Sequence, residues 1–163
     1  MATLGVIGSG NIGSALTWLA IEAGIEVVMA NSRGPESLAD KARALGFRAG
    51  TVDEAARAGD WVVVAIPLGR YLELPVESFA GKVVLDTMNY YPHRDGRIDR
   101  LDREVVTTAQ LLQDRLPEAH TVKAFSNISA GTSWPWPGPP THRIAVRCRS
   151  PATTRRRRPR APP

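Results

Sequence analysis

The feature of the sequence that most constrains the fold is a glycine-rich turn that follows a short apolar run near the N-terminus. Residues 4–7 are typical of a β-strand, and Gly8, Gly10 and Gly13 follow it at the spacing G-x-G-x-x-G. In a strand–turn–helix unit the first glycine permits the tight turn, the second lets the backbone approach a pyrophosphate, and the third lets the helix pack closely on its strand. The helix N-terminus then offers free N–H groups to the anion. The stretch therefore predicts the first strand and phosphate-binding turn of a nucleotide-binding fold.

The rest of the chain has the strands and helices that such a fold needs. Runs of apolar residues predict five further strands, over residues 25–30, 47–50, 61–66, 82–86 and 121–125. Helical spacing predicts helices over about 12–23, 35–45, 52–58 and 107–116, two of them opened by capping boxes, whereas 68–81 and 89–103 are predicted to be loops, the first with one helical turn. This alternation predicts an α/β fold with a doubly wound parallel sheet of six strands, the Rossmann arrangement.

The charge is divided unequally along the chain. Although the net charge is +5, residues 1–133 hold all 16 acidic residues and only 13 of the 21 basic ones. The last thirty residues hold the other eight basic residues, all arginine, together with eight of the 13 prolines and no acidic residue. We therefore predict a folded domain over 1–131 and a disordered Pro/Arg-rich tail over 132–163. A frameshift or an altered 3′ end of the gene near residue 132 is one hypothesis for this composition.

Other features of the composition restrict the class of protein. The single cysteine, Cys148, excludes an internal disulfide framework and favours a reducing compartment, so we expect a cytoplasmic protein. The longest apolar run, residues 61–68, is too short to cross a bilayer. No cluster has metal-ligand spacing and no catalytic set of side chains stands out, so no metal site and no catalytic residue is predicted. The arginine run 155–158 is compatible with binding to nucleic acid, but a tail without a partner is the simpler interpretation.

The turn after the second predicted strand indicates which dinucleotide the fold prefers. An NAD-preferring fold places a carboxylate there, which accepts a hydrogen bond from the ribose 2′-hydroxyl. This chain instead has Asn31, Ser32 and Arg33, and its next acidic residue is Glu36, inside the predicted helix. Ser32 can donate to a phosphate oxygen, and the Arg33 guanidinium can hold a 2′-phosphate through two hydrogen bonds. A solvated polar turn is the alternative, but behind the glycine turn the pattern favours NADP.

Several motifs, taken in order, resemble those of the coenzyme F420-dependent NADP oxidoreductases. They are Gly8 to Gly13, Asn31-Ser32-Arg33, Ala65-Ile66-Pro67, Asp86-Thr87-Met88-Asn89-Tyr90-Tyr91-Pro92 and Val122-Lys123-Ala124-Phe125. The resemblance covers about residues 3–131. It implies a Rossmann domain that binds NADP, and hydride exchange between NADPH and the deazaflavin coenzyme F420.

The resemblance also implies roles for individual residues. It assigns Ser9, Asn11 and Ile12 to the pyrophosphate turn together with Gly8, Gly10 and Gly13, and Ser32 and Arg33, beside Asn31, to the 2′-phosphate. It places Ile66 and Pro67 beside the adenosine and ribose, and Asn89 near the nicotinamide. Hydride transfer between two cofactors requires proximity, orientation and exclusion of water more than acid–base chemistry.

The sequence departs from the family in two places. Ser126-Asn127 stands where the family tends to have Asn-Asn or Asn-Thr. The family continues into a helical lobe that helps to form the deazaflavin cleft and the dimer, whereas this chain continues into the Pro/Arg-rich tail. A non-catalytic NADP-binding module is therefore the alternative to an oxidoreductase, and a homodimer remains an expectation.

Four other residues are candidates for the site, each with a simpler interpretation beside the functional one. His93 is more simply interpreted as a solvated loop histidine than as a proton donor. Lys123 is compatible with either a cleft residue or a charge at the sheet edge, and Tyr90 and Tyr91 with either stacking on a ring or anchoring a loop.

Overall fold

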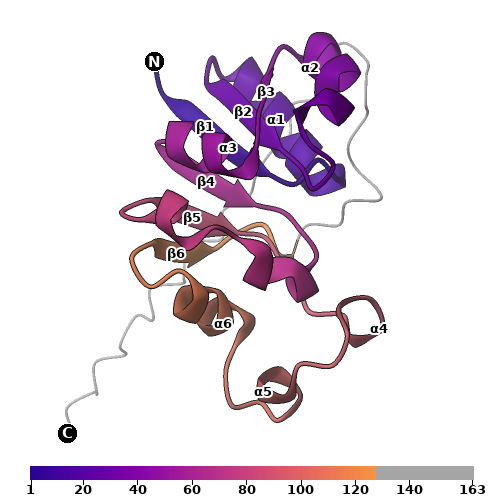
Figure 1. Ribbon diagram of the computed structural model, residues 1–163, viewed down its shortest axis with the longest axis vertical. Helices are drawn as coiled ribbons and strands as arrows, with labels where there is room; N and C mark the ends of the chain where they lie inside the picture. The colour runs from indigo at the N-terminus through magenta and orange to yellow at the C-terminus, as the bar shows by residue number, and fades with distance from the viewer. Residues whose placement is uncertain (128–163) are drawn as a thin grey trace, which may run out of the picture.

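Residues 1–127, which the computed structural model describes, build a parallel sheet of six strands with helices on both faces (Figure 1). In chain order the strands are β1 (Thr3–Ile7), β2 (Glu26–Ala30), β3 (Arg48–Ala49), β4 (Trp61–Val64), β5 (Val83–Asp86) and β6 (His120–Lys123). Their order in the sheet is β3-β2-β1-β4-β5-β6, so β3 and β6 form its two edges. This is the doubly wound order, in which the chain builds first to one side of β1 and then to the other. The predicted Rossmann fold with six strands is confirmed.

Helices connect the strands. Within the described residues they are α1 (Asn11–Glu22), α2 (Ala39–Leu45), α3 (Val52–Ala58), α4 (Pro92–Asp95), α5 (Asp99–Asp102) and α6 (Thr108–Arg115), with the 3₁₀ helices η1 (Pro35–Leu38), η2 (Leu68–Glu73) and η3 (Val76–Phe79). Both predicted capping boxes are present: Thr51 caps α3 through the N–H of Glu54, and Thr107 caps α6 through the N–H of Gln110. Such a cap stabilises a helix by about 1 kcal/mol.

β1 lies at the centre of the sheet and sets its register. Val6 is opposite Met29 of β2 on one side and opposite Val63 of β4 on the other. These three side chains are almost completely buried. Because both faces of the central strands are covered, their sequences are apolar without alternation, and this is why the strands were recognisable in the sequence.

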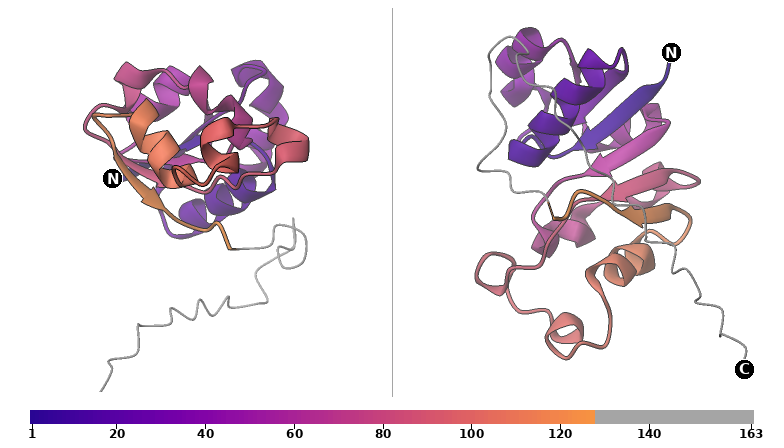
Figure 2. Two further views of the ribbon diagram at one scale, coloured as in Figure 1. Left: turned by 90° about the horizontal axis from the view of Figure 1, so that it is seen from below. Right: turned by 180° about the vertical axis from the view of Figure 1, so that it is seen from behind.

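Two apolar clusters join the sheet to its helices, one on each face. α1 and α2 cover one face, where Leu16 and Leu45 pack in a cluster with Val6. On the other face α3, η2, η3 and α6 enclose a cluster that contains the fully buried Phe79 and Leu112. Figure 2 shows these layers from below and from behind. The helices thus fix the sheet from both sides and leave the ends of its strands open.

The segment between β4 and β5 is more regular than the predicted loop with a single helical turn. Pro67 and Pro75 precede two successive 3₁₀ helices, η2 and η3. The buried side chains of Leu68, Leu74 and Phe79 attach this segment to the core. Proline fixes the backbone for the start of each helix, and the leucines and phenylalanine supply the packing that holds it.

The segment predicted as a polar loop over 89–103 contains the short helices α4 and α5. It extends away from the sheet at the bottom of Figure 1. The hydroxyl of Tyr90 anchors it, because it donates to Asp102 (2.8 Å) and accepts from the backbone N–H of Ile98 (2.9 Å). Burial, which outweighs the opposing hydrogen bond from Ile98, raises the pKa of Tyr90 and keeps the hydroxyl protonated. Of the two interpretations of Tyr90, the loop anchor is therefore the one that the contacts favour.

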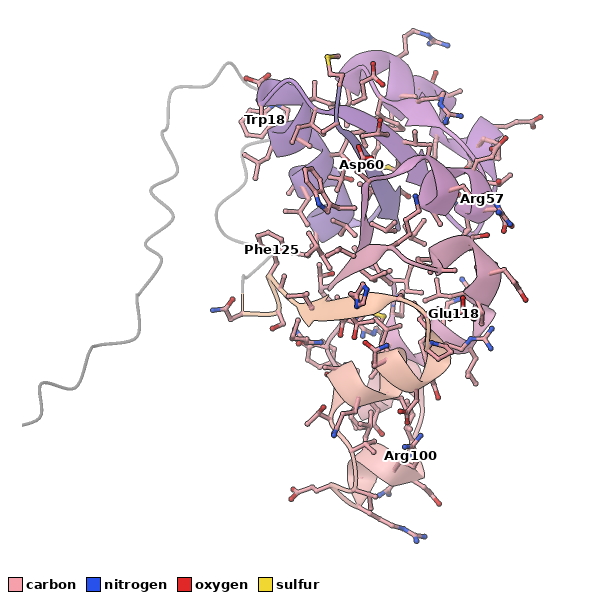
Figure 3. The ribbon with its side chains drawn as sticks, turned by 90° about the vertical axis from the view of Figure 1, so that its left-hand side faces the viewer. Trp18, Arg57, Asp60, Arg100, Glu118 and Phe125 are labelled. Carbon is pink, nitrogen blue, oxygen red and sulfur yellow. The ribbon has the colours of Figure 1, made fainter. Side chains whose placement is uncertain are left out.

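β6 ends two residues earlier than predicted. Phe125 has a φ of 57°, a left-handed backbone conformation that cannot continue a strand. Its side chain, 38% exposed, lies with Trp18 of α1 on the same side of the sheet (Figure 3).

The predicted domain boundary at residue 131 and the Pro/Arg-rich tail 132–163 lie outside the described residues. Within residues 1–127, no helix has both the length and the apolar character needed to cross a membrane. In the same part of the chain, no three His, Cys, Asp or Glu side chains are grouped so that they could hold a metal ion.

Candidate functional site

Two adjoining cavities open at the carboxyl ends of the central strands. The first, of about 370 Å³, we call the β2-side cavity; it is lined by Ile7, Gly8, Ser9, Gly10, Asn31, Ser32, Arg33, Val52, Ala65, Ile66, Pro67, Arg70, Glu73 and Leu74. The second, of about 400 Å³, we call the β5-side cavity; it is lined by Gly10, Asn11, Ile12, Ala65, Ile66, Pro67, Thr87, Met88, Asn89, Tyr91 and Arg94. They meet at Gly10 and at residues 65–67, where the strand order reverses between β1 and β4. This is the position at which open α/β sheets bind their ligands.

Gly8 and Gly10, which lie between β1 and α1, and Gly13, which lies in the first turn of α1, meet different structural requirements. A Cβ on Gly8 would lie 2.2 Å from the carbonyl oxygen of Ala65, and one on Gly13 would lie 1.9 Å from the carbonyl oxygen of Gly8. A Cβ on Gly10, by contrast, would meet no described atom within 4 Å. Packing inside the protein therefore requires Gly8 and Gly13, whereas Gly10 only keeps the cleft open at the place where both cavities meet.

The first turn of α1 presents N–H groups toward this cleft. Gly10 is its N-cap, and no side chain among the described residues caps the helix. The N–H of Ser14 bonds to the carbonyl of Gly10 at 2.9 Å, whereas no backbone partner among residues 1–127 accepts from the N–H groups of Asn11, Ile12 and Gly13. Such groups at the positive end of a helix form a ready site for an anion.

Asn31 joins the glycine turn to the turn that follows β2. Its Nδ2 donates to the hydroxyl of Ser9 (3.3 Å) and to that of Ser37 (2.9 Å), while its Oδ1 accepts from the backbone N–H of Arg33 (2.8 Å). The side chain is thus fully used within the protein. Asn31 lines the cavity, but the role its contacts support is to fix the relative positions of Ser9 and Arg33.

The basic side chains around the β2-side cavity differ in whether another group of the protein already binds them. Among the described residues, no carboxylate lies within ion-pairing distance of Arg33, which is exposed at the cavity. Arg70 is paired with Glu73. Lys41 of α2 reaches the glycine turn from behind, where its Nζ donates to the carbonyl of Ser9 and to the hydroxyl of Ser14, both at 2.9 Å. Arg33 is therefore the guanidinium available to a phosphate, and Lys41 supports the turn.

The β5-side cavity is bordered by a set of hydrogen bonds around Asn89. Its Nδ2 donates to the carbonyl of Ser126 (2.8 Å), which ties the segment after β5 to the segment after β6. The backbone carbonyl of Asn89 accepts from Nη2 of Arg94 (2.8 Å). The Arg94 guanidinium lies over the ring of Tyr91, 4.9 Å from its centroid, and forms two hydrogen bonds with Asp95.

Asp95, whose side chain is completely buried, holds this arrangement in place. Burial alone would raise its pKa, but hydrogen bonds from the guanidinium of Arg94 and the backbone N–H groups of Tyr91 and Gly69 outweigh burial and lower the pKa. The carboxylate is therefore ionised at neutral pH, and Arg94 and Tyr91 have a fixed geometry at the cavity wall.

The structure brings together the residues predicted for the site. All of them line one of the two cavities except Gly13, which lies beneath the turn where α1 meets β1. Lys123 does not line either cavity: its ammonium bonds to the carboxylate of Asp86 (3.0 Å) and to the carbonyl of Met88. His93 lies in α4, where it packs against Tyr91.

The sequence interpretation did not include several residues that border the site. Lys41, Arg70, Glu73 and Arg94 belong to this group. Arg70 and Glu73 are three residues apart, a spacing that is typical of a surface ion pair. Lys41 lies in the predicted helix 35–45, where a lysine is typical of the solvated face. The sequence signal for Arg70 and Glu73 is that their segment directly follows the motif Ala65-Ile66-Pro67.

Comparisons with known proteins identify a family and several solved structures of similar fold. Residues 3–90 match the family described as NADP oxidoreductase, coenzyme F420-dependent. A hypothetical protein from Sinorhizobium meliloti has a similar structure, with 31% identity and a TM-score of 0.67 over 80% of this chain and 64% of that one. No match was found among curated protein sequences.

Two further solved structures show the same fold. A protein from Arthrobacter sp. FB24, provisionally described as an F420-dependent NADP reductase, has 20% identity and a TM-score of 0.68 over 80% of this chain and 64% of that one. A protein from Pseudomonas putida KT2440, provisionally described as an oxidoreductase, has 19% identity and a TM-score of 0.57 over 75% of this chain and 39% of that one. The chain thus spans less than two thirds of the length of these relatives.

Proposed function

Because the chain belongs to the coenzyme F420-dependent NADP oxidoreductase family, we propose that it binds NADPH across the two cavities and passes its hydride to a deazaflavin or similar acceptor. The observation that carries the proposal is the pair of adjoining cavities at the reversal of strand order. One holds Arg33, which has no ion-pair partner among the described residues, and the other holds Asn89. A dinucleotide is the class of ligand that needs two such compartments joined by an anion-binding turn.

The residues present fit this cofactor. The first turn of α1, which no described side chain caps, and the space at Gly10 suit a pyrophosphate, while Ser32 and Arg33 suit a 2′-phosphate. Among the described residues, Glu73 is the one acidic residue that lines the β2-side cavity, and its carboxylate is paired with Arg70 and not with Arg33. Ile66 and Pro67 separate the two compartments and would lie against the adenosine and ribose.

NADPH, when bound, supplies the hydride, and the protein contributes its orientation. Asn89, held by Ser126 and Arg94, would fix the nicotinamide end, and the Tyr91–Arg94 pair would form the outer wall of that compartment. No described residue is required to move a proton. Exclusion of water and alignment of the two reacting carbons are the contributions expected of such a site.

A non-catalytic NADP-binding module is the second candidate. The observation that favours it is that the described residues around the two cavities fit NADPH, whereas none of the described residues is assigned to the hydride acceptor. Binding of NADPH and transfer of its hydride are therefore tested separately.

The binding test uses NADPH and NADH with Arg33→Ala. Because Arg33 is exposed, we expect its removal to cost about the 1.5–3 kcal/mol of one charge-assisted hydrogen bond. The dissociation constant for NADPH should therefore rise roughly 10- to 100-fold, while that for NADH stays unchanged. Arg57→Ala is the matched control, because Arg57 lies on α3, outside the lining of both cavities (Figure 3). Equal affinity of the wild-type protein for NADPH and NADH would contradict the role of Arg33.

The turnover test follows the absorbance of coenzyme F420 with NADPH as reductant. Reduction at a rate above that of the mixture without protein would support the oxidoreductase. Tight binding of NADPH without reduction would leave the module as the better description.

A further inference from the structure

A second ion pair lies in the β2-side cavity, beyond the residues assigned to phosphate. Arg70 and Glu73 are three residues apart on η2 and form a fork: Nε of Arg70 donates to one carboxylate oxygen (2.8 Å) and Nη2 to the other (2.5 Å). Both side chains are about half exposed, and both line the cavity. Neither is used by the proposed contacts with phosphate.

The helix that carries this pair is anchored at both ends. Leu68 at its start and Leu74 just past its end are almost completely buried. The carbonyl of Leu74 also accepts a hydrogen bond from Nη2 of Arg115 on α6, at 2.7 Å. The pair is therefore held on a fixed wall of the cavity.

The pair presents one donor edge and one acceptor edge side by side. An arginine has five N–H groups, so two remain on Nη1 and one on Nη2 after the fork forms, and each carboxylate oxygen keeps a lone pair. The hydrogen bonds from Arg70 lower the pKa of Glu73, so the acceptor stays ionised. Because the two charges offset one another, this wall does not attract a phosphate as Arg33 does.

We propose that Arg70 and Glu73 recognise the base of the dinucleotide. The Glu73 carboxylate accepts from the 6-amino group of adenine, and the Arg70 guanidinium donates to the neighbouring ring nitrogen, N1. Val52, Ile66 and Leu74 supply apolar walls for a flat ring in the same cavity. The inference rests on the proposed binding of NADPH and adds selectivity for adenine to it.

The chemistry of the base makes the proposal specific. Adenine places a donor, its amino group, beside an acceptor nitrogen, and this pattern is complementary to the pair. Hypoxanthine places a carbonyl oxygen and a ring N–H at the same positions, so it would set an acceptor against the carboxylate and a donor against the guanidinium. A site that hydrogen-bonds one pattern discriminates against the reverse, because its polar groups are left unpaired.

The experiment compares NADPH with its deamino analogue, in which hypoxanthine replaces adenine, by titration calorimetry. We expect the wild-type protein to bind the analogue about 10-fold more weakly or worse. In Glu73→Gln the ratio of the two dissociation constants should fall to within about threefold, because the amide can rotate to donate or to accept. Glu73→Gln also removes a negative charge from the cavity. The effect of that charge on binding affinity cancels in the ratio, because both nucleotides carry the same phosphates.

Asp40→Asn is the matched control. Asp40 also pairs with an arginine three residues away, Arg43, at 3.1 Å, but neither side chain lines the β2-side or the β5-side cavity. This variant should keep the wild-type ratio, and both variants should melt close to the wild type because exposed ion pairs contribute about 0–1 kcal/mol.

The possible results separate this inference from the proposed function. Tight binding of NADPH with an equal affinity for the analogue would overturn the reading of the base and leave NADPH binding intact. A wild-type ratio in Glu73→Gln would also overturn it. Absence of any NADPH binding by the folded wild-type protein would overturn both proposals.

Discussion

Substitution of Gly10 by alanine should separate ligand binding from stability in this chain. Gly10 has a φ of −71° and a ψ of −171°, which any residue adopts, and an added Cβ would meet no described atom within 4 Å. The new methyl group would instead stand at the junction of the two cavities. The position thus tolerates alanine sterically in the free protein and opposes a ligand that must approach the backbone.

The effect on stability is the difference of two small terms. Replacing glycine by alanine at a compatible backbone conformation stabilises a protein by about 0.4–1 kcal/mol through the unfolded chain. Alanine is, however, a poorer N-cap than glycine, by a similar amount. We therefore expect Gly10→Ala to change the free energy of unfolding by less than about 1 kcal/mol.

Gly13→Ala gives the opposite expectation and serves as the contrast. Its Cβ would lie 1.9 Å from the carbonyl oxygen of Gly8, so α1 must move away from the turn. Overpacking of this kind costs about 1–3 kcal/mol or more, which corresponds to a melting temperature lower by roughly 2–12 °C.

The binding effect of Gly10→Ala should be large. A methyl group at the turn would displace the pyrophosphate from the N–H groups of α1, and the loss of two charge-assisted hydrogen bonds, about 3 kcal/mol or more, weakens binding over 100-fold. Urea unfolding and NADPH titration of the same samples measure both quantities. The reasoning is refuted if Gly10→Ala binds NADPH within threefold of the wild type, or if it unfolds as easily as Gly13→Ala.

Two further predictions concern residues that support the site. Lys41→Met should weaken NADPH binding about 10-fold and Lys41→Arg should restore most of it, because the lysine holds the carbonyl of Ser9; equal loss in both variants, measured by titration, would contradict this role. The pKa of Asp95 is lowered in the folded protein, so its contribution to stability is complete above the unfolded value of about 4 and is lost as the pH falls through the lowered pKa. Asp95→Asn should therefore reduce the slope of unfolding free energy against pH below about pH 4, and an unchanged slope would show that Asp95 is not linked to folding.

The sheet and the glycine turn were predictable because their physical causes are local. The central strands are apolar throughout since both their faces are covered, and Gly8 and Gly13 mark the positions where backbones approach closely. Thr51 with Glu54 forms its capping box within one turn of helix. Each of these features is specified by residues that are near one another in the chain.

The residues that complete the site depend on contacts over long separations. Lys41 reaches Ser9 across 32 positions, and Arg115 supports Leu74 across 41. Neither contact has a spacing that a sequence pattern can indicate. The same holds for Asn31, which joins two turns through its bond to Ser9, 22 positions away.

The two edge strands, β3 and β6, bear on whether copies of this protein would aggregate through the sheet at high concentration. β3 is only two residues long and begins with the exposed Arg48, so it offers little edge for another chain to extend. β6 ends in Lys123, whose charge is held against the buried Asp86. A molecule that docked on this edge would have to desolvate that ammonium. Neutralising Lys123 would therefore be expected to favour aggregation through β6, even though Lys123 does not line the nucleotide cleft.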